Sequence, residues 1–424
     1  MTSNVSRWTR TLAFALTGIS MASVAAASAA ELTVWCWDPN FNIPAMADAG
    51  ARYTAAHPET TFNINNITQD EINQKLQTQF LAGVSDGLPD IVLIQDDNIQ
   101  RFLQSFPGSF VPLSDHIDMS QFASYKVAAA THEGKSYSLP FDSGVTGLFY
   151  RADYLEEAGY KPEDVQDITW DRLIEIGKDM LAKTGHPLID MDYNDDGQII
   201  MMMQSTGQWY LKDGNEPNII GNTALKASLE TFQEMAQAGL IKPVSDWTGY
   251  TGAFTSGEVA MVPQGVWITG TIKSVPEQAG KWRVAPMPKL DGVEGATQYS
   301  NNGGSSWYVL ASSQNQDEAI DFFKTVWASD VDFYQGILVN QGAVGSLLAA
   351  REGDAYKASD PFFSDEPVWQ NFSDWLAQVP SVDYGTFTPE ARLAVRAQLP
   401  NIANGGDIDE ALKAIDAQLR QQMQ

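Results

Sequence analysis

The stretch of residues 31–42 constrains the fold of this chain most. Its first six residues alternate polar and apolar side chains and are rich in β-branched and aromatic types, which predicts a buried strand over 31–36. Residues 38–40 must then form a turn, and Pro44 suits the first turn of a helix because its missing N–H would have no partner there. A strand, a polar loop and a helix N-terminus form the corner where open α/β sheets hold their ligands. We therefore expect a first candidate site at this corner.

Further strand–helix units follow along the chain. The pattern predicts a helix over 45–56, a strand over 60–65, a helix over 69–81 and an apolar strand over 90–94 that is covered on both faces. Successive units of this kind imply a parallel sheet, whose strand ends meet at one edge. The residues that we expect around a cleft at this edge are Trp37, Asp38, Asn40, Gln69, Asp96 and Asp97.

The pattern changes after residue 136. Pro and Gly break two short extended runs at 137–140 and 145–150, and we interpret the break at 141–144 as a crossing between domains. Two domains are expected because 424 residues exceed one typical domain. The remaining predictions are helices over 152–158, over 169–183 with Thr169 as N-cap, over 223–238 with Gly239 as stop and over the tail from 366 onward, ending with 408–419, and strands over 258–262, 282–285 and 306–310.

The first 29 residues are typical of an export signal. Arg7 and Arg10 give a basic start, residues 12–27 are apolar, and residues 27–29 are small, as at a cleavage site. The alternative, a membrane anchor, needs about 20 strongly apolar residues, whereas this run is short and rich in Ala and Ser. No Cys lies at the cleavage point, which disfavours a lipid anchor. We expect a signal peptide over 1–29, cleaved near Ala29, and a periplasmic location.

The charge of the chain limits its partners. The net charge is −27, and it becomes −29 once Arg7 and Arg10 leave with the signal. Such a charge opposes binding to nucleic acid or anionic lipid and favours neutral partners. The single cysteine, Cys36, excludes an internal disulfide, and its place in an apolar strand indicates a small core residue. We expect a monomer that uses no cofactor and binds no nucleic acid.

Residues 192–197 match the first half of a calcium loop. Asp192, Asn194 and Asp196 supply oxygen atoms at alternate positions, and Gly197 follows where such a loop turns sharply. The twelfth position, where a bidentate Glu belongs, is Met203. A solvated acidic turn is therefore favoured over a metal site, because Asp, Asn and Gly are common in turns.

The chain carries no recognisable catalytic signature. Its four histidines lack metal-ligand spacing and a nucleophile motif, and no glycine loop suited to phosphate is present. Among 53 acidic residues some carboxylate pair suited to glycoside hydrolysis can always be found, and Asp38 with Asp97 is the nearest candidate. We predict no catalytic residues.

Several of the 12 tryptophans lie in polar, turn-like settings. Each alone is more often a core residue, because large aromatic side chains are usually buried. Together, beside carboxylates and amides, they suit a carbohydrate, whose C–H faces stack on rings and whose hydroxyls donate to charged acceptors. The tryptophans in such settings are Trp37, Trp209, Trp247 and Trp267.

Taken in order, several short motifs resemble those of family 1 extracellular solute-binding proteins, the carbohydrate receptors of ABC importers, which are related to maltose-binding protein. The likeness extends over nearly the whole chain after the signal. The segments that carry it are 32–35 with the Asp38 turn, 89–92 leading to Asp97, 137–140 through 150–155, 254–261 through 265–267, Gly303 and Gly304 before the strand at 306, and 319–326.

This resemblance implies an α/β fold of the two-lobed periplasmic-binding-protein type (type II), with parallel-rich sheets flanked by helices and a hinge between the lobes. We place the first lobe at 30–143 and 304–343 and the second at 144–303 and 344–424. By the same resemblance, Asp38 and Asp97 would accept hydrogen bonds from sugar hydroxyls, Trp267 would stack on the sugar, and Gly303 would bring its backbone near the ligand. The candidate ligand-binding set also includes Asp142 and Asn302 near the crossings.

The implied function is capture of a neutral sugar or oligosaccharide and its delivery to permease subunits in the inner membrane. Pro39 and Ile94 replace a polar contact and a ring of the maltose binder, which argues against maltose. The segment 35–42 resembles receptors for galactosides such as lactose and for other plant-derived oligosaccharides. Two alternatives stay open. One is a secreted glycoside hydrolase, and the other is a receptor for a different solute, such as a peptide or a sulfonated sugar, the latter needing a cation such as Arg351 to dominate the pocket.

Overall fold

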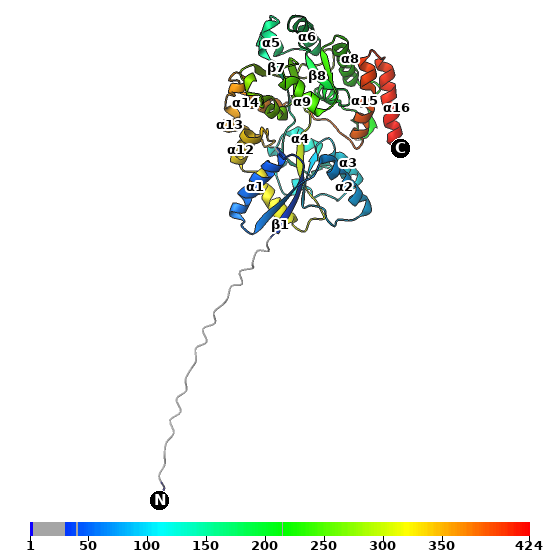
Figure 1. The fold of residues 1–424 in the computed structure, drawn as a ribbon. Coiled ribbons are helices and arrows are strands. Elements are labelled where there is room, and N and C mark those ends of the chain that lie inside the picture. Colours follow the sequence, from blue (N-terminus) through cyan, green and yellow to red (C-terminus); the bar gives the residue numbers. More distant parts are fainter. Residues whose placement is uncertain (3–29, 40, 214) are drawn as a thin grey trace.

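Two lobes, one above the other in Figure 1, make up the part of the chain that the computed structural model describes, residues 1–2, 30–39, 41–213 and 215–424. The first lobe is built on a five-stranded sheet, and the second on a three-stranded sheet with a separate pair of parallel strands. The expected export signal with its cleavage point, and Asn40, lie outside the described residues. No helix in the described ranges is both long and apolar enough to cross a bilayer.

The sheet of the first lobe has the strand order β2-β1-β3-β14-β6. Its first three strands run parallel, as the repeated strand–helix units predict. The other two are joined through antiparallel pairings of β14, so the sheet is mixed rather than parallel throughout. The reason is that β14 enters from the second lobe, at the edge where the parallel strands end. The strands are β1 (Ala30–Cys36), β2 (Thr60–Asn66), β3 (Ile91–Gln95), β6 (Leu139–Pro140) and β14 (Ser305–Val309).

Side chains of β1 alternate between two cores, because successive residues of a strand point to opposite faces of the sheet. Leu32, Val34 and Cys36 pack in the core that includes the first helix, whereas Trp35 packs on the other face. Cys36 has no exposed surface, and burial raises the pKa of its thiol to about 12. The prediction that Cys36 is a core residue is confirmed.

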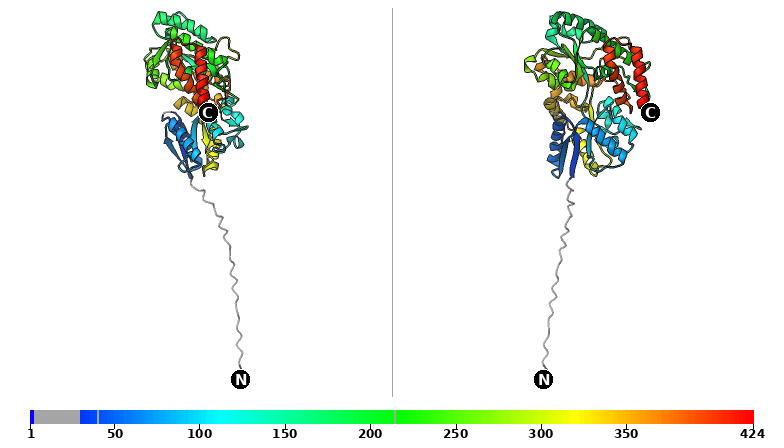
Figure 2. Two further views of the ribbon diagram at one scale, coloured as in Figure 1. Left: turned by 90° about the vertical axis from the view of Figure 1, so that its right-hand side faces the viewer. Right: turned by 45° about the vertical axis from the view of Figure 1, so that its right-hand side comes forward.

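The helices of the first lobe lie on both faces of its sheet (Figures 1 and 2). The first two begin and end within three residues of the predicted bounds. The segment 319–326, one of those that carry the family resemblance, lies in a short α-helix, α11, and in the π-helical turn that follows it, Phe323–Trp327. The lobe also carries a small hairpin, β4 (Thr131–His132) with β5 (Lys135–Ser136). The helices are α1 (Asn42–Ala56), α2 (Gln69–Ala82), α3 (Ile99–Ser105), α4 (Ser124–Ala129), α11 (Gln316–Phe322) and α12 (Val331–Gln341).

The second lobe contains an antiparallel sheet of order β12-β7-β13 and a parallel pair, β8 with β11. The strand predicted at 258–262 begins only at Met261, because the preceding helix ends in a turn in which Gly257 has φ +78° and the Glu258 N–H donates back to Ala253 at 2.8 Å. The strands are β7 (Thr146–Arg151), β8 (Ile189–Asp192), β11 (Ile241–Val244), β12 (Met261–Gly265) and β13 (Trp282–Ala285), besides a hairpin of β9 (Leu211–Lys212) and β10 (Glu216–Pro217).

Helix ends in the second lobe follow the local sequence signals. The Thr169 hydroxyl accepts from the Arg172 N–H at 3.3 Å, and Gly239 follows its helix with φ +71°, so both predictions are confirmed. The tail predicted as helical from 366 onward is instead interrupted at residues 377–387, where Pro380 lacks an N–H. The helices are α5 (Ala152–Glu157), α6 (Trp170–Thr184), α7 (Gly197–Gln204), α8 (Thr223–Gln237), α9 (Trp247–Thr255), α10 (Thr269–Lys273), α13 (Asp354–Lys357), α14 (Val368–Leu376), α15 (Thr388–Ala403) and α16 (Ile408–Gln422).

The chain passes between the lobes at three places that lie side by side. Residues 141–145 lead from β6 to β7, residues 301–304 lead into β14, and residues 342–347 follow α12. Asp142 forms a bridge with Gly345, and Val145 forms one with Asn301. The observed crossings fit the predicted break at 141–144, and the exact lobe boundaries stay a prediction.

Asp96 and Asp142, both expected at the ligand cleft, are buried instead and hold these crossings. Asp96 forms an ion pair with Lys126, which has no exposed surface and also donates to the Ser305 carbonyl at 2.8 Å. The Ser306 hydroxyl donates to Asp96 at 2.9 Å. Asp142 accepts from the N–H and the hydroxyl of Ser305 at 2.8 and 2.6 Å. Buried carboxylates need such partners, which leaves these two little capacity for a ligand.

Lys126→Met is expected to destabilise the protein by about 3–5 kcal/mol, because it leaves Asp96 buried without its cation. Burial raises the pKa of Asp96 to about 6 even with Lys126 present. The loss should therefore shrink as the pH falls from 7 to 4.5 and Asp96 becomes neutral. Urea unfolding at both pH values measures this, with Lys135→Met as control, because Lys135 makes an exposed pair with Asp115. Equal effects of the two variants would contradict the role given to Lys126.

Candidate functional site

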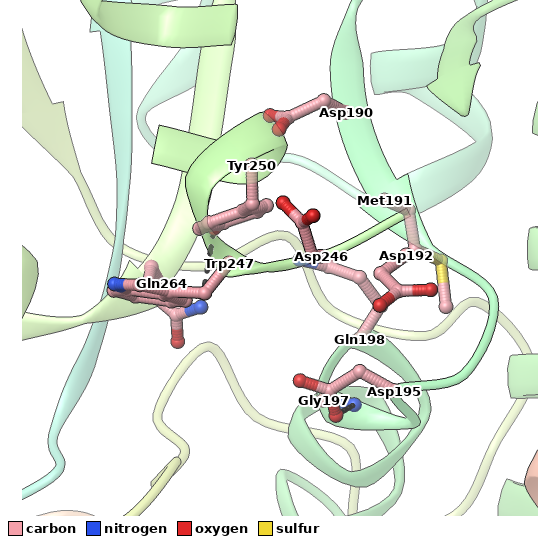
Figure 3. Close-up of a pocket in the computed structure, with 10 residues that line it drawn as sticks. All are labelled: Asp190, Met191, Asp192, Asp195, Gly197, Gln198, Asp246, Trp247, Tyr250 and Gln264. Carbon is pink, nitrogen blue, oxygen red and sulfur yellow. Dashed lines mark hydrogen bonds between the residues drawn. The ribbon is translucent and has the colours of Figure 1, made fainter. Parts of the chain in front are cut away.

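The ends of the parallel strands β8 and β11 bring acidic residues together at one edge of the second lobe. Asp192 ends β8 and is followed by the turn into α7. Asp246 follows β11 and caps α9, where its carboxylate accepts from the Gly249 N–H at 2.8 Å. Figure 3 shows Asp192, Asp195 and Asp246 around the space between these two helices. This is the edge at which open α/β sheets bind ligands.

Three aromatic rings lie beside these carboxylates. Trp247, the first residue of α9, stacks on Tyr250 at a centroid distance of 5.4 Å and lies 5.9 Å from the ring of Trp267. Trp247 is 55% exposed, whereas most large apolar side chains of the described residues are buried. Trp267 is half-buried in a single helical turn after β12. An exposed ring supported by two others offers a rigid face on which a ligand can stack.

A chain of hydrogen bonds fixes the positions of these rings. The Trp267 indole N–H donates to the Asn302 carbonyl at 2.8 Å, and the Asn302 amide donates to Gln264 at 2.6 Å. Gln264 in turn donates to the Tyr250 hydroxyl at 3.1 Å. A Cβ at Gly265 would lie 2.3 Å from the Trp267 indole nitrogen, so only glycine permits this ring position. The crossing at 301–304 thus holds the ring cluster.

A cavity of about 140 Å³ opens beside the ring of Trp247 (Figure 3). Its walls come from β8, the start of α7, α9 and the end of β12. Oxygen-bearing side chains dominate its lining. The residues are Asp190, Met191, Asp192, Asp195, Gly197, Gln198, Asp246, Trp247, Tyr250 and Gln264.

Asp190 is the most deeply buried carboxylate of this cavity, with 2% of its surface exposed. Burial raises the pKa of Asp190 to about 7, and the hydrogen bond from its own backbone N–H and the charge of Lys242 offset this only in part. Burial also raises the pKa of the Tyr250 hydroxyl, with the charge of Asp190 acting in the same direction. The hydroxyl of Tyr250 therefore stays protonated beside Asp190.

An ion-pair network joins the two lobes next to this cavity. Arg392 of α15 donates to Asp97 of the first lobe at 2.7 Å and to Asp196 of the second at 3.0 Å. Asp196 is fully buried and also accepts from Arg396 at 2.9 Å. Burial alone would raise the pKa of Asp196, but the two arginines hold it below the usual value. Asp97 thus meets a cation of the opposite lobe at the cleft.

The acidic residues of the calcium motif form hydrogen bonds within this network and within their own turn. Asp196 accepts from two arginines and from the Tyr210 hydroxyl, and Asp192 accepts from the Asn194 N–H within its own turn. No group of three or more His, Cys, Asp or Glu in the described part of the chain is arranged to hold a metal. The weak calcium prediction at Asp192, Asn194 and Asp196 therefore gains no support from the arrangement.

The candidate residues of the first lobe lie at the carboxyl ends of its strands. Trp37 and Asp38 follow β1 and are partly buried, and the Asn42 amide oxygen accepts from their N–H groups at 3.1 and 3.0 Å. Gln69 opens α2. Figure 1 shows β1 running from the outer end of the first lobe toward the second. These residues thus stand at the edge that the second lobe covers.

Trp209 does not belong to this site. Its ring is 2% exposed, its indole N–H donates to the Thr388 hydroxyl at 2.8 Å, and it packs edge-on against Tyr384. The polar sequence around Trp209 suggests a surface turn, but α15 folds back over it. The prediction for Trp247, Trp267, Asn302 and Gly303 agrees with their placement in and beside the ring cluster, and their contact with a ligand stays a prediction.

Sequence reasoning missed Tyr250, Gln264, Asp190 and Arg392. Tyr250 lies three residues after Trp247 on one helix, and Gln264 lies three residues before Trp267, so spacing arguments could have found both. Asp190 gave a clearer signal, since it is an acidic residue between Ile189 and Met191 in a short strand. Arg392 gave none, because it is 295 residues from Asp97 in the sequence.

Asp190→Asn is expected to raise the melting temperature of the ligand-free protein at pH 8 and to change it little at pH 4. The native carboxyl titrates at about 7, against about 3.9 in an unfolded chain. Between these values the native state binds more protons, so stability falls as the pH rises from 4 to 7, by at most about 4 kcal/mol. Thermal unfolding by circular dichroism measures this. The exposed Asp291→Asn is the control, and equal shifts at both pH values would contradict the prediction.

Similar proteins are found among both sequences and solved structures. A lactose-binding protein from Rhizobium radiobacter is 56% identical over 415 residues, covering 98% of each chain. An arabinooligosaccharide-binding protein from Bacillus subtilis (strain 168) is 25% identical over 69% of this chain and 68% of its own. The ABC-transporter-associated binding protein from B. animalis subsp. lactis Bl-04, solved with beta-1,6-galactobiose, has a TM-score of 0.74 and 23% identity, covering 92% of this chain and 97% of that one.

The family models give the same assignment. Residues 48–361 match the model described as bacterial extracellular solute-binding protein. This match and the 56% identical relative confirm both the family resemblance and the two-lobed α/β fold that it implies. The chain belongs to the bacterial extracellular solute-binding protein family.

Proposed function

We propose that this protein is the periplasmic receptor of an ABC importer, which captures a neutral galactoside such as lactose between its lobes and delivers it to permease subunits. It acts as a monomer after export and cleavage near Ala29, and it breaks no bond. The observation that carries the proposal is the exposed ring of Trp247, supported by Trp267 and Tyr250 and surrounded by carboxylates and amides.

This set of groups suits a sugar for a physical reason. The faces of a sugar ring expose C–H groups that stack on tryptophan, and the hydroxyls at its rim donate to carboxylates. The name of the 56% identical relative supports lactose as the first ligand to test. The ligand-binding residues that we propose are Trp37, Asp38, Gln69, Asp97, Trp247, Trp267, Asn302 and Gly303.

Binding would work by closure of the two lobes. Ligand that touches both lobes favours the closed form by as much as its affinity for the closed form exceeds that for the open one. The pair of Asp97 with Arg392, and the pair of Arg101 with Glu390, join the lobes beside the cleft. Hydrogen bonds from the sugar hydroxyls to both lobes would add to the contacts that these ion pairs already make between the lobes.

The enzyme alternative finds less support in the geometry. Hydrolysis by Asp38 and Asp97 needs one carboxyl as a general acid and the other as a base or nucleophile. Asp97 already accepts from the Arg392 guanidinium at 2.7 Å. A carboxylate with this partner is better suited to align a hydroxyl than to transfer a proton.

Lactose is expected to raise the melting temperature of the mature protein and to be recovered intact. Ligand at 100 times its dissociation constant stabilises a native state by about 2.7 kcal/mol, which is several degrees. Differential scanning fluorimetry with lactose and with maltose, followed by chromatography of the sugar, gives both answers. Galactose and glucose in the eluate would identify an enzyme. The absence of a shift with every neutral sugar tested would refute the receptor proposal.

Trp247→Ala should weaken lactose binding by about 1–3 kcal/mol, roughly 5- to 150-fold, because it removes the stacking face. Isothermal titration calorimetry measures the loss, and Trp247→Phe should retain much of the affinity. The matched control is Tyr160→Ala. It removes an aromatic side chain whose hydroxyl donates a hydrogen bond to Asp179, on the outer side of the second lobe. Unchanged affinity in Trp247→Ala would exclude this ring from the binding site.

A further inference from the structure

All the charged side chains that line the cavity beside Trp247 are acidic, and Arg392 and Arg396 approach only Asp195 among them, at 3.9 and 4.0 Å. Four of its ten lining residues are aspartates, and none is Lys, Arg or His. Three of the aspartates use an oxygen to hold the local backbone. Asp192 accepts from the Asn194 N–H, Asp195 from the Gly197 N–H at 2.9 Å, and Asp246 from the Gly249 N–H. Their carboxylates are thus fixed in position around the cavity.

Two further oxygens of this lining have no protein partner among the described residues. They are Asp190 Oδ2 and Gln198 Oε1, on side chains that are 2% and 5% exposed. The Gln198 amide nitrogen donates to the Pro263 carbonyl at 2.9 Å, which fixes its oxygen as the unpaired group. Buried acceptors without partners are rare in proteins and destabilise them. A ligand group that donates hydrogen bonds would satisfy both of these acceptors.

The size of the cavity points to a ligand group. Its volume of about 140 Å³ is roughly ten times the space that one ordered water needs. It opens beside the ring of Trp247, on which we propose that the sugar stacks. A metal ion does not fit, because the carboxylates of the described residues do not converge as a ligand set.

We propose that this cavity is a specificity subsite that receives the hydrogen-donating substituents of one ring of the bound disaccharide, and that it accepts an ammonium group there as well as hydroxyls. The proposal rests on the receptor function given above and extends the ligand range to amino sugars. The side-chain oxygens of Asp190 and Gln198 would accept the hydrogen bonds from these substituents. The same lining excludes carboxylate and sulfate groups, because they bring negative charge and no donors to four aspartates.

The test compares matched disaccharides by isothermal titration calorimetry at pH 7.5. The probes are lactose, its 2-amino-2-deoxy analogues with a free amine on either ring, and its analogues oxidised to a C6 carboxylate on either ring. For the ring that enters the cavity, we expect the amine to bind within threefold of lactose or more tightly, and the carboxylate to bind at least tenfold more weakly.

Variants then locate the effect. Asp190→Asn keeps the shape of the side chain and removes its charge, so it should weaken the amine analogue at least tenfold and lactose less. Gln198→Met removes the other unpaired oxygen and should measurably weaken the binding of lactose. It provides a second test of the cavity if one of the variants folds poorly. Asp291→Asn makes the same change of charge on the exposed surface and should bind all probes as the wild type does.

The outcomes separate this proposal from the receptor function. Equal affinity of wild type and Asp190→Asn for both lactose and the amine analogues would overturn the subsite alone. Carboxylate analogues that bind as well as lactose on both rings would do the same. A wild-type protein that binds no neutral disaccharide would overturn the receptor function and the subsite with it.

Discussion

The close contact of the chain crossings between the lobes is the constraint on which the site depends. At Gly144 the backbone approaches the Asn302 carbonyl so closely that a Cβ would lie 2.4 Å from that oxygen. The Asn302 N–H also donates to the Gly144 carbonyl at 2.8 Å. Asn302, held in this way, accepts from Trp267 and donates to Gln264, which reaches Tyr250. The hinge therefore positions the rings of the proposed binding surface. A conformational change at the crossings would also move these rings.

Buried charge divides the molecule into structural and functional carboxylates. Among the described residues, some buried aspartates form an ion pair with a cation and others do not. Lys126 neutralises Asp96 at the hinge, and Arg392 with Arg396 neutralises Asp196 at the cleft. Asp190 lies beside the cavity without an ion pair of this kind, and burial raises its pKa to about 7. Unneutralised buried charge next to an open cavity is what a donor-bearing ligand can stabilise.

The two lobes contribute different chemistry to the cleft. The ring cluster of Trp247, Trp267 and Tyr250, which we propose as the stacking surface, belongs to the second lobe, and the first lobe places Trp37 and polar groups at the ends of its parallel strands. The contact of Asp97 with Arg392 is where the two sets meet in this structure. Such a division favours a ligand that stacks on one lobe first and is then enclosed by the other, as in hinge closure.

The sequence by itself determined the parallel strands of the first lobe, the helix ends at Thr169 and Gly239 and the core position of Cys36, because alternation, capping and turn formation depend on neighbouring residues. It also carried enough ordered motifs to indicate the family. Only the tertiary structure decided which acids remain available. Asp96, Asp142 and Trp209 resemble the proposed site residues in sequence, yet their partners Lys126, Ser305 and Thr388 are 30, 163 and 179 residues away. Burial and charge pairing arise between distant segments, so no local pattern can show which polar side chain has been used by the fold and which is left for a ligand.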